Sequence, residues 1–111
     1  PPHVVDLRLE YPQATSSKAF FAKVHSEAAG SAKYKTWGKP QAVSLWRDDI
    51  ITVTVYTADS EEDFNRLRRE EFAEVYIPWS IVSEQTADGV EVVFSLGISR
   101  GSRWLGHNAP L

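Results

Sequence analysis

Ionisable and hydroxyl side chains in two segments of the chain have the chemistry expected of a catalytic site. Asp6 and Arg8 alternate with apolar residues near the start of the chain, and Tyr56 ends a run of apolar and threonine residues. An acid beside an arginine is suited to moving a proton while a carboxylate or enolate is held, and a tyrosine hydroxyl donates a hydrogen bond to an oxyanion. We therefore predict Asp6, Arg8 and Tyr56 as catalytic residues.

Histidine supplies another candidate for proton transfer, because its side chain titrates near neutral pH without help. His25 lies at the border of the apolar positions around it and is predicted as a catalytic acid or base. His107 lies in a glycine-rich tail and is predicted to contact substrate if that tail docks. No two histidines have the i,i+3 or i,i+4 spacing of a helical metal site, and there are no cysteines. With no phosphate-binding loop either, we expect neither a metal nor an organic cofactor.

The first residue suggests a different chemistry. Pro1, as a free N-terminal residue, is a secondary amine, and burial of such an amine in an apolar pocket makes it a neutral base. A tautomerase that uses Pro1 is therefore a further alternative.

Length and composition indicate one small globular domain over residues 1–111. The apolar fraction is 42% and the charged fraction 24%, which is ordinary for a chain with one hydrophobic core. Twelve basic and fifteen acidic residues give a formal charge of −3, so we expect no nucleic acid partner. No apolar run approaches the roughly 18 residues that cross a bilayer, so we expect no membrane partner. The absence of cysteine is compatible with a reducing compartment, and we expect a cytoplasmic location.

Alternation and capping signals predict the elements that position these residues. Hydroxyls at residues 15–17 suit the N-cap of a first helix that ends at Gly30, and Asp59 or Ser60 caps a second helix whose apolar stripe closes at Phe72. Period-two alternation predicts strands over residues 5–10, 42–47, 50–57, 75–83 and 90–98, with a turn at Asp48-Asp49 and an interruption at Pro78.

This order of elements is typical of the ferredoxin-like fold. We predict an α+β domain with a β-α-β-β-α-β sheet and an additional C-terminal strand. In that fold both helices cover one face of the sheet, so the other face needs a different cover or solvent. The free face would display Asp6, Arg8, Thr54 and Tyr56 together, and Thr54 is predicted to bind substrate.

The stretch from Trp46 to Val82 resembles the dimeric α+β barrel group and, within it, the muconolactone-isomerase-like proteins. The features that carry the resemblance are Trp46-Arg47, the apolar strand from Ile50 to Tyr56, the acidic helix start from Asp59 to Phe64, and Tyr76-Ile77-Pro78-Trp79. The strand over residues 90–98 and the tail with Trp104 depart from that group.

The resemblance implies a homodimer whose sheets face each other around a small pocket. Such pockets serve cofactor-free isomerases and cyclases that act by proton transfer on a hydrophobic acid or ketone, aromatic-derived or polyketide-like. In this chain we predict that Trp46 and Trp79 contact that small-molecule substrate.

The alternative class is a non-catalytic ligand-binding or protein-interaction module. The long final strand and the apolar pair Trp104-Leu105 would then engage a partner by edge addition. The free sheet face distinguishes the two classes. A closed cavity with an acid or base beside an arginine or tyrosine favours an enzyme, and a flat face without such a cavity favours a partner protein.

Overall fold

The computed structural model describes residues 1–13, 17–86 and 93–100. In chain order the elements are β1 His3–Glu10, β2 Ala19–Ser26, β3 Gly30–Lys33, β4 Gln41–Leu45, β5 Ile50–Ala58, α1 Glu61–Asn65, β6 Glu70–Pro78, α2 Trp79–Gln85 and β7 Val93–Gly97.

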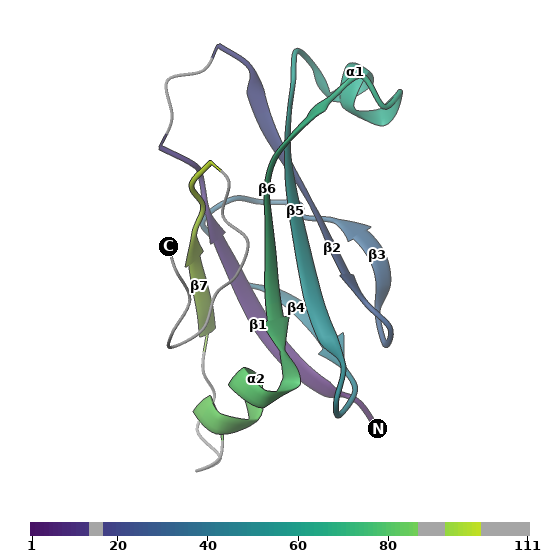
Figure 1. Ribbon diagram of the computed structural model, residues 1–111, viewed down its shortest axis with the longest axis vertical. Coiled ribbons are helices and arrows are strands. Elements are labelled where there is room, and N and C mark those ends of the chain that lie inside the picture. Colours follow the sequence, from purple (N-terminus) through teal and green to yellow (C-terminus); the bar gives the residue numbers. More distant parts are fainter. Residues whose placement is uncertain (14–16, 87–92, 101–111) are drawn as a thin grey trace.

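The described strands form two sheets that pack face to face, with the two short helices at opposite ends (Figure 1). One sheet has the order β4-β1-β7, and β1 pairs antiparallel with β4 and parallel with β7. The other sheet has the order β3-β2-β5-β6 and is antiparallel throughout. The chain is therefore α+β in composition, with most of its described regular structure in strands.

The core lies between the two sheets, because alternate residues of each strand point inward. The inward side chains of β1 and β5, one strand from each sheet, are among the most buried of the described residues, and burial of each such side chain stabilises the fold by about 1.5–3 kcal/mol. In β1 and β5 these inward residues are Val5, Leu7, Leu9, Ile51, Val53 and Val55.

The strand predictions for residues 5–10, 42–47 and 50–57 are confirmed by β1, β4 and β5. Asp48 has a φ of 64° in the turn between β4 and β5, so the predicted turn is also confirmed. The last strand is confirmed over Val93–Gly97, and the rest of its predicted start lies outside the described residues.

The first predicted helix is wrong, because the sequence between residues 15 and 30 contains the strand β2 instead. Its inward residues include Phe20, Ala22 and Val24, which alternate at a period of two. Phe21 also matched a helical stripe, but it points to the outer face of the sheet. Gly30, expected to end a helix, has a φ of 70° and closes the short connection to β3.

The second predicted helix is shorter than expected. The Ser60 side chain caps α1 by accepting a hydrogen bond from the Asp63 backbone N–H at 3.1 Å, as the sequence indicated. The helix ends at Asn65, however, and Phe72 lies in β6. The predicted strand beyond Pro78 is wrong, because β6 ends at this proline and α2 follows directly. Neither of the two described helices is long and apolar enough to cross a membrane.

These differences change the arrangement of the strands. The described elements do not follow the predicted strand–helix–hairpin–helix–strand order, because β2 takes the place of the first helix. As a result β1 and β5, which the prediction placed in one sheet, belong to different sheets.

Two buried hydroxyl groups hold the connections between the sheets. Ser26, at the end of β2, donates from Oγ to the Ser44 carbonyl of β4 at 2.6 Å. The Tyr34 hydroxyl accepts a hydrogen bond from the Leu9 backbone N–H of β1 at 3.2 Å and donates to the Lys39 carbonyl. The Ser26 hydroxyl thereby satisfies a backbone group of a distant strand, and the Tyr34 hydroxyl satisfies backbone groups of two segments that are distant from each other in sequence.

Candidate functional site

The predicted catalytic residues lie on two opposite outer faces of the molecule. Asp6 and Arg8 are on the outer face of the three-stranded sheet. His25, Thr54 and Tyr56 are on the outer face of the four-stranded sheet. Because the core separates these faces, the structure does not bring the acid and arginine of β1 together with the tyrosine of β5.

Arg8 connects β1 to β7. Its Nη2 donates to Ser95 Oγ of β7 at 2.6 Å, and its Nε lies 3.2 Å from Glu10 Oε1. The second contact has an ion-pair distance without hydrogen-bond geometry. Asp6 is paired in register with Ala42 of β4 and Val93 of β7. The Arg8 guanidinium is therefore already engaged in a contact between β1 and β7.

His25 is engaged with the hairpin that β2 forms with β3. Its Nδ1 lies 2.8 Å from Ser31 Oγ, and its Nε2 lies 3.6 Å from Glu27 Oε1. Both ring nitrogens thus have partners from this hairpin.

The two predicted substrate-binding tryptophans lie at the end of the molecule that carries the β4–β5 turn. An open depression of about 220 Å³ is present there, and Trp79 forms part of its wall, with its ring centroid 4.6 Å from that of His3. Trp46 is 46% exposed. Pro1 is also exposed. His107 and Trp104 lie outside the described residues. The residues that line the depression are Asp48, Asp49, Pro78, Trp79 and Ser80.

Asp49 holds the turns at this end together. Its carboxylate accepts hydrogen bonds from the backbone N–H groups of Ile50 at 2.7 Å, Glu27 at 3.1 Å and Ala28 at 3.4 Å. Partial burial acts to raise the pKa of Asp49, but these hydrogen bonds together outweigh it and hold the pKa below its usual value. The carboxylate therefore joins the β2–β3 connection to the start of β5 as an anion.

We expect the stabilisation from Asp49 to disappear in acid. Because the pKa is lower in the folded state, the contribution is fully present above the unfolded-state value of about 3.9 and is lost as the pH falls through the folded-state pKa. Asp49→Asn should lower the free energy of unfolding by about 1 kcal/mol at pH 7. Urea unfolding at several pH values should show this difference shrinking below about pH 4.

Asp48→Asn is the matched control, since the adjacent carboxylate has no hydrogen bond described for it. Its effect should stay within about 0.5 kcal/mol at every pH. A difference between wild type and Asp49→Asn that does not vary with pH would contradict the assignment.

A group of aromatic and basic side chains lies on the outer face of the four-stranded sheet. β2 places Phe21 directly opposite Tyr56 of β5. Phe64 of α1 stacks on Phe21, with ring centroids 4.9 Å apart and an interplanar angle of 18°, and its centroid lies 5.7 Å from that of Tyr56. Phe64 is buried by these contacts, so α1 is held against the sheet. Together with Lys33 and Arg69, these three residues form what we call the cation–aromatic cluster.

Two cations lie over these rings. Arg69 Cζ is 4.2 Å from the Tyr56 centroid and 4.7 Å from the Phe64 centroid. Lys33 Nζ lies about 6 Å from the Phe21 and Phe64 centroids and forms an ion pair with Glu61. Among the described residues, the hydrogen bond from Arg69 goes to the Phe64 carbonyl at 3.4 Å. Most of the guanidinium donors are therefore left without a protein acceptor.

Lys23 extends this basic area along β2. It is paired in register with Lys33 of β3 on one side and Thr54 of β5 on the other. Two like charges directly opposite each other destabilise a sheet. Glu74, on the same row of β6, is two strands away, about 10 Å at roughly 4.8 Å per strand. No ion pair or hydrogen bond of Lys23 is described within residues 1–13, 17–86 and 93–100.

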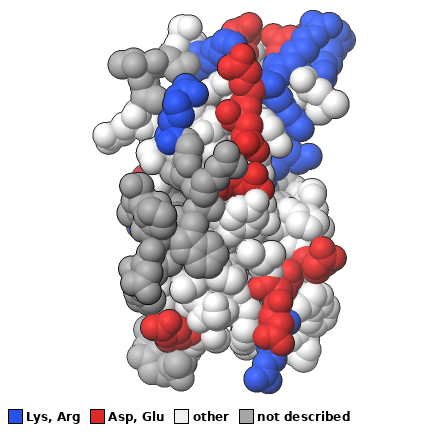
Figure 2. Space-filling view, in the orientation of Figure 1, with Lys and Arg blue, Asp and Glu red and all other residues white. Residues whose placement is uncertain are grey.

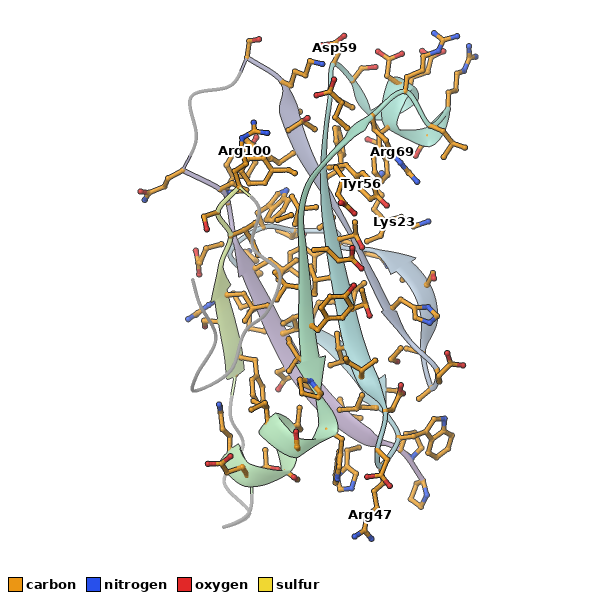
Figure 3. All side chains as sticks on the ribbon, viewed as in Figure 1. Lys23, Arg47, Tyr56, Asp59, Arg69 and Arg100 are labelled. Atoms are coloured by element: carbon orange, nitrogen blue, oxygen red, sulfur yellow. The ribbon has the colours of Figure 1, made fainter. Side chains whose placement is uncertain are left out.

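The outer face of the four-stranded sheet is therefore divided by charge. β2 and β3 contribute Lys23 and Lys33, and β6 contributes Glu71 and Glu74. Figure 2 shows a column of acidic side chains in the upper half of the molecule with basic side chains to its right. In Figure 3, Lys23 and Arg69 are seen near Tyr56 in the upper half, while Arg47 lies at the opposite end.

Sequence reasoning identified Tyr56 and Thr54 on this face but missed Phe21, Lys23 and Arg69. The first two were assigned to a helix, and no local spacing connects β2 with the segment after α1. The one local signal was the series of arginines after Phe64, which a single helix could also explain.

Within the described part of the chain, no group of three or more histidine and carboxylate side chains is placed to hold a metal ion. Comparisons with protein-family models, curated proteins and solved structures found no significant match.

Proposed function

We propose that this chain is a non-catalytic binding module that takes a ligand with phosphate or carboxylate groups on the outer face of its four-stranded sheet. The observation that carries the proposal is the unneutralised positive charge at Lys23. Lys23 is paired in register with Lys33, and no carboxylate partner is described for it within the described ranges. Lys33 already has Glu61 as an ion-pair partner, so an anion bound beside Lys23 would neutralise the charge that is left on this part of the sheet.

The cation–aromatic cluster supports the same function. Arg69 lies over Tyr56 and Phe64, which restricts the position of the guanidinium and leaves donors available to an anion. Because arginine loses less conformational freedom when it is already held in place, an anion meets a preorganised donor. The Tyr56 hydroxyl, for which no hydrogen bond is described, is a further donor on this face.

An isomerase or cyclase needs its proton-transfer group within hydrogen-bond reach of the reacting atom. Asp6 and Arg8 are on one side of the core and Tyr56 is on the other, and the depression at Trp79 contains none of these three. The binding class is therefore favoured over proton-transfer catalysis. The homodimer expected from the sequence stays a prediction, as does the cytoplasmic location.

The anion site is tested by titrating the protein with inorganic pyrophosphate and citrate at constant low ionic strength, followed by amide NMR. Shifts should concentrate on β2, β3 and Arg69. Lys23→Gln should weaken binding roughly tenfold, because one charge-assisted contact is removed from the site.

Arg47→Gln is the matched control, since it removes one positive charge at the opposite end of the molecule (Figure 3). It should leave the affinity within about a factor of two, through the general screening of charge. Equal weakening by both substitutions, or shifts spread evenly over all basic residues, would show only nonspecific attraction and would remove the proposal.

A further inference from the structure

Leu67 adopts a backbone conformation that leucine rarely takes. It follows the C-cap of α1 and has a φ of 62°. The Leu67 N–H donates to the Phe64 carbonyl at 3.1 Å, and the Arg68 N–H donates to the Asp63 carbonyl at 2.8 Å. These two hydrogen bonds form the Schellman motif that ends many helices, and the residue at the position of Leu67 in that motif is usually glycine. A side chain there carries a backbone strain that glycine avoids.

The same residue is also the most exposed of the large apolar side chains in the described ranges. Its exposed fraction is 71%. Neither feature stabilises the folded chain. Glycine would adopt the positive φ without strain, and a polar side chain would be better solvated at this exposed position. A residue that is unfavourable in two respects for folding points to a role outside the fold.

The charges around Leu67 indicate what kind of surface it meets. Arg66 Nη2 lies 3.0 Å from Glu62 Oε1, and Arg68 Nη1 lies 3.7 Å from Asp63 Oδ1, so both flanking arginines are paired within the segment. Residues 59–71 contain six acidic residues and three arginines, a formal charge of −3. An anionic lipid surface would be repelled by this segment, whereas a basic protein surface would be attracted.

We propose that Leu67 is the anchor of a protein interface and inserts into an apolar socket, rimmed by lysine or arginine, on a partner protein. A few side chains that fill well-packed, desolvated pockets supply most of the binding energy of an interface. The acidic collar of residues 59–71 aligns the two surfaces. Leu67 is not part of the cation–aromatic cluster, although residues 59–71 include Phe64 and Arg69 of that cluster, so the test substitutions are made at Leu67 alone.

The test uses the full chain as the target for selection from a displayed library of three-helix scaffold proteins with randomised surfaces. Most independent binders should carry basic residues around apolar ones. They should lose at least roughly tenfold in affinity with Leu67→Gly and Leu67→Ala, and little with Leu67→Met, which keeps a long apolar side chain. Thermal unfolding should show a higher midpoint for Leu67→Gly, because the strain is relieved, and no such rise for Leu67→Ala.

Several outcomes overturn the proposal. Binders that are mostly insensitive to Leu67→Gly, or that are mostly acidic, would show that this residue is not the preferred contact. A lowered midpoint for Leu67→Gly would remove the argument from strain. Recruitment to vesicles of phosphatidylserine and phosphatidylcholine that depends on Leu67 would replace the protein partner by a membrane. Loss of pyrophosphate binding in Lys23→Gln bears only on the anion site.

Discussion

Replacing Phe64 with alanine is expected to lower the free energy of unfolding by about 3 kcal/mol, the lower end of the range for truncation of a buried phenylalanine. Phe64 is buried although it lies on the outer face of a sheet, because Phe21 and Tyr56 pack on its ring and Arg69 covers it. Its removal also takes away one of the two rings on which the guanidinium stacks. Urea unfolding measures the first effect, and the pyrophosphate titration should show weaker binding in the same variant.

Phe64→Leu separates the two effects. Leucine restores most of the buried apolar area, so the loss of stability should fall to about 1–1.5 kcal/mol, but it offers no aromatic face to the cations. Anion binding should therefore be weakened in both variants. If Phe64→Ala lowers the free energy of unfolding by less than about 1 kcal/mol, α1 is not held against the sheet by this ring.

Tyr34→Phe is expected to lower the free energy of unfolding by about 2 kcal/mol. The hydroxyl is the described partner of the Leu9 N–H and also donates to the Lys39 carbonyl. Removing it leaves the buried Leu9 N–H and the part-buried Lys39 carbonyl without this bond, and a buried unsatisfied group costs about 1–3 kcal/mol, with the smaller share from the carbonyl. Phenylalanine keeps the ring packing, so the loss isolates the hydrogen bonds. Chemical denaturation measures it.

Tyr11→Phe provides the comparison for this change. Tyr11 is half-exposed, and its contacts in the described chain are with the rings of Phe20 and Trp37, which phenylalanine keeps. Its effect should be within about 0.5 kcal/mol. Similar losses in the two variants would mean that the Tyr34 hydroxyl does not secure the connection to β1.

The strands that have one apolar face and one polar face were predictable from the sequence. β5 alternates between buried aliphatic and half-buried polar residues, and period two identifies it without ambiguity. β2 was not predictable in the same way, because Phe21 on its outer face is covered by Phe64. With apolar side chains on both faces the alternation disappears, and Phe20-Phe21-Val24 fits a helix equally well. The contact that resolves the ambiguity joins residues 43 positions apart.

Which candidate residues lie together depends on the strand order, and the strand order predicted from the sequence was wrong. Alternation correctly placed Asp6, Arg8, Thr54 and Tyr56 on outer faces. It contains no information on which strands share a sheet, so a ferredoxin-like order put all four on one face. The burial of Phe72 was not predictable from alternation either. It lies in β6 where the pairing with β5 is irregular, and it is buried together with its neighbour Ala73.

The position of β1 between β4 and β7 has a consequence for synthesis. Arg8 is bonded to Ser95, 87 residues later in the chain, and β1 is the central strand of its sheet. While the nascent chain leaves the ribosome, β2 and β3 can pair with each other at once, whereas one side of β1 has no partner until β7 has emerged. Strand pairings of such long range form slowly, so an apolar strand edge stays open to wrong partners during translation. Rapid release of the last strand, or a chaperone that shields the first one, would therefore affect the yield of folded protein more than its final stability.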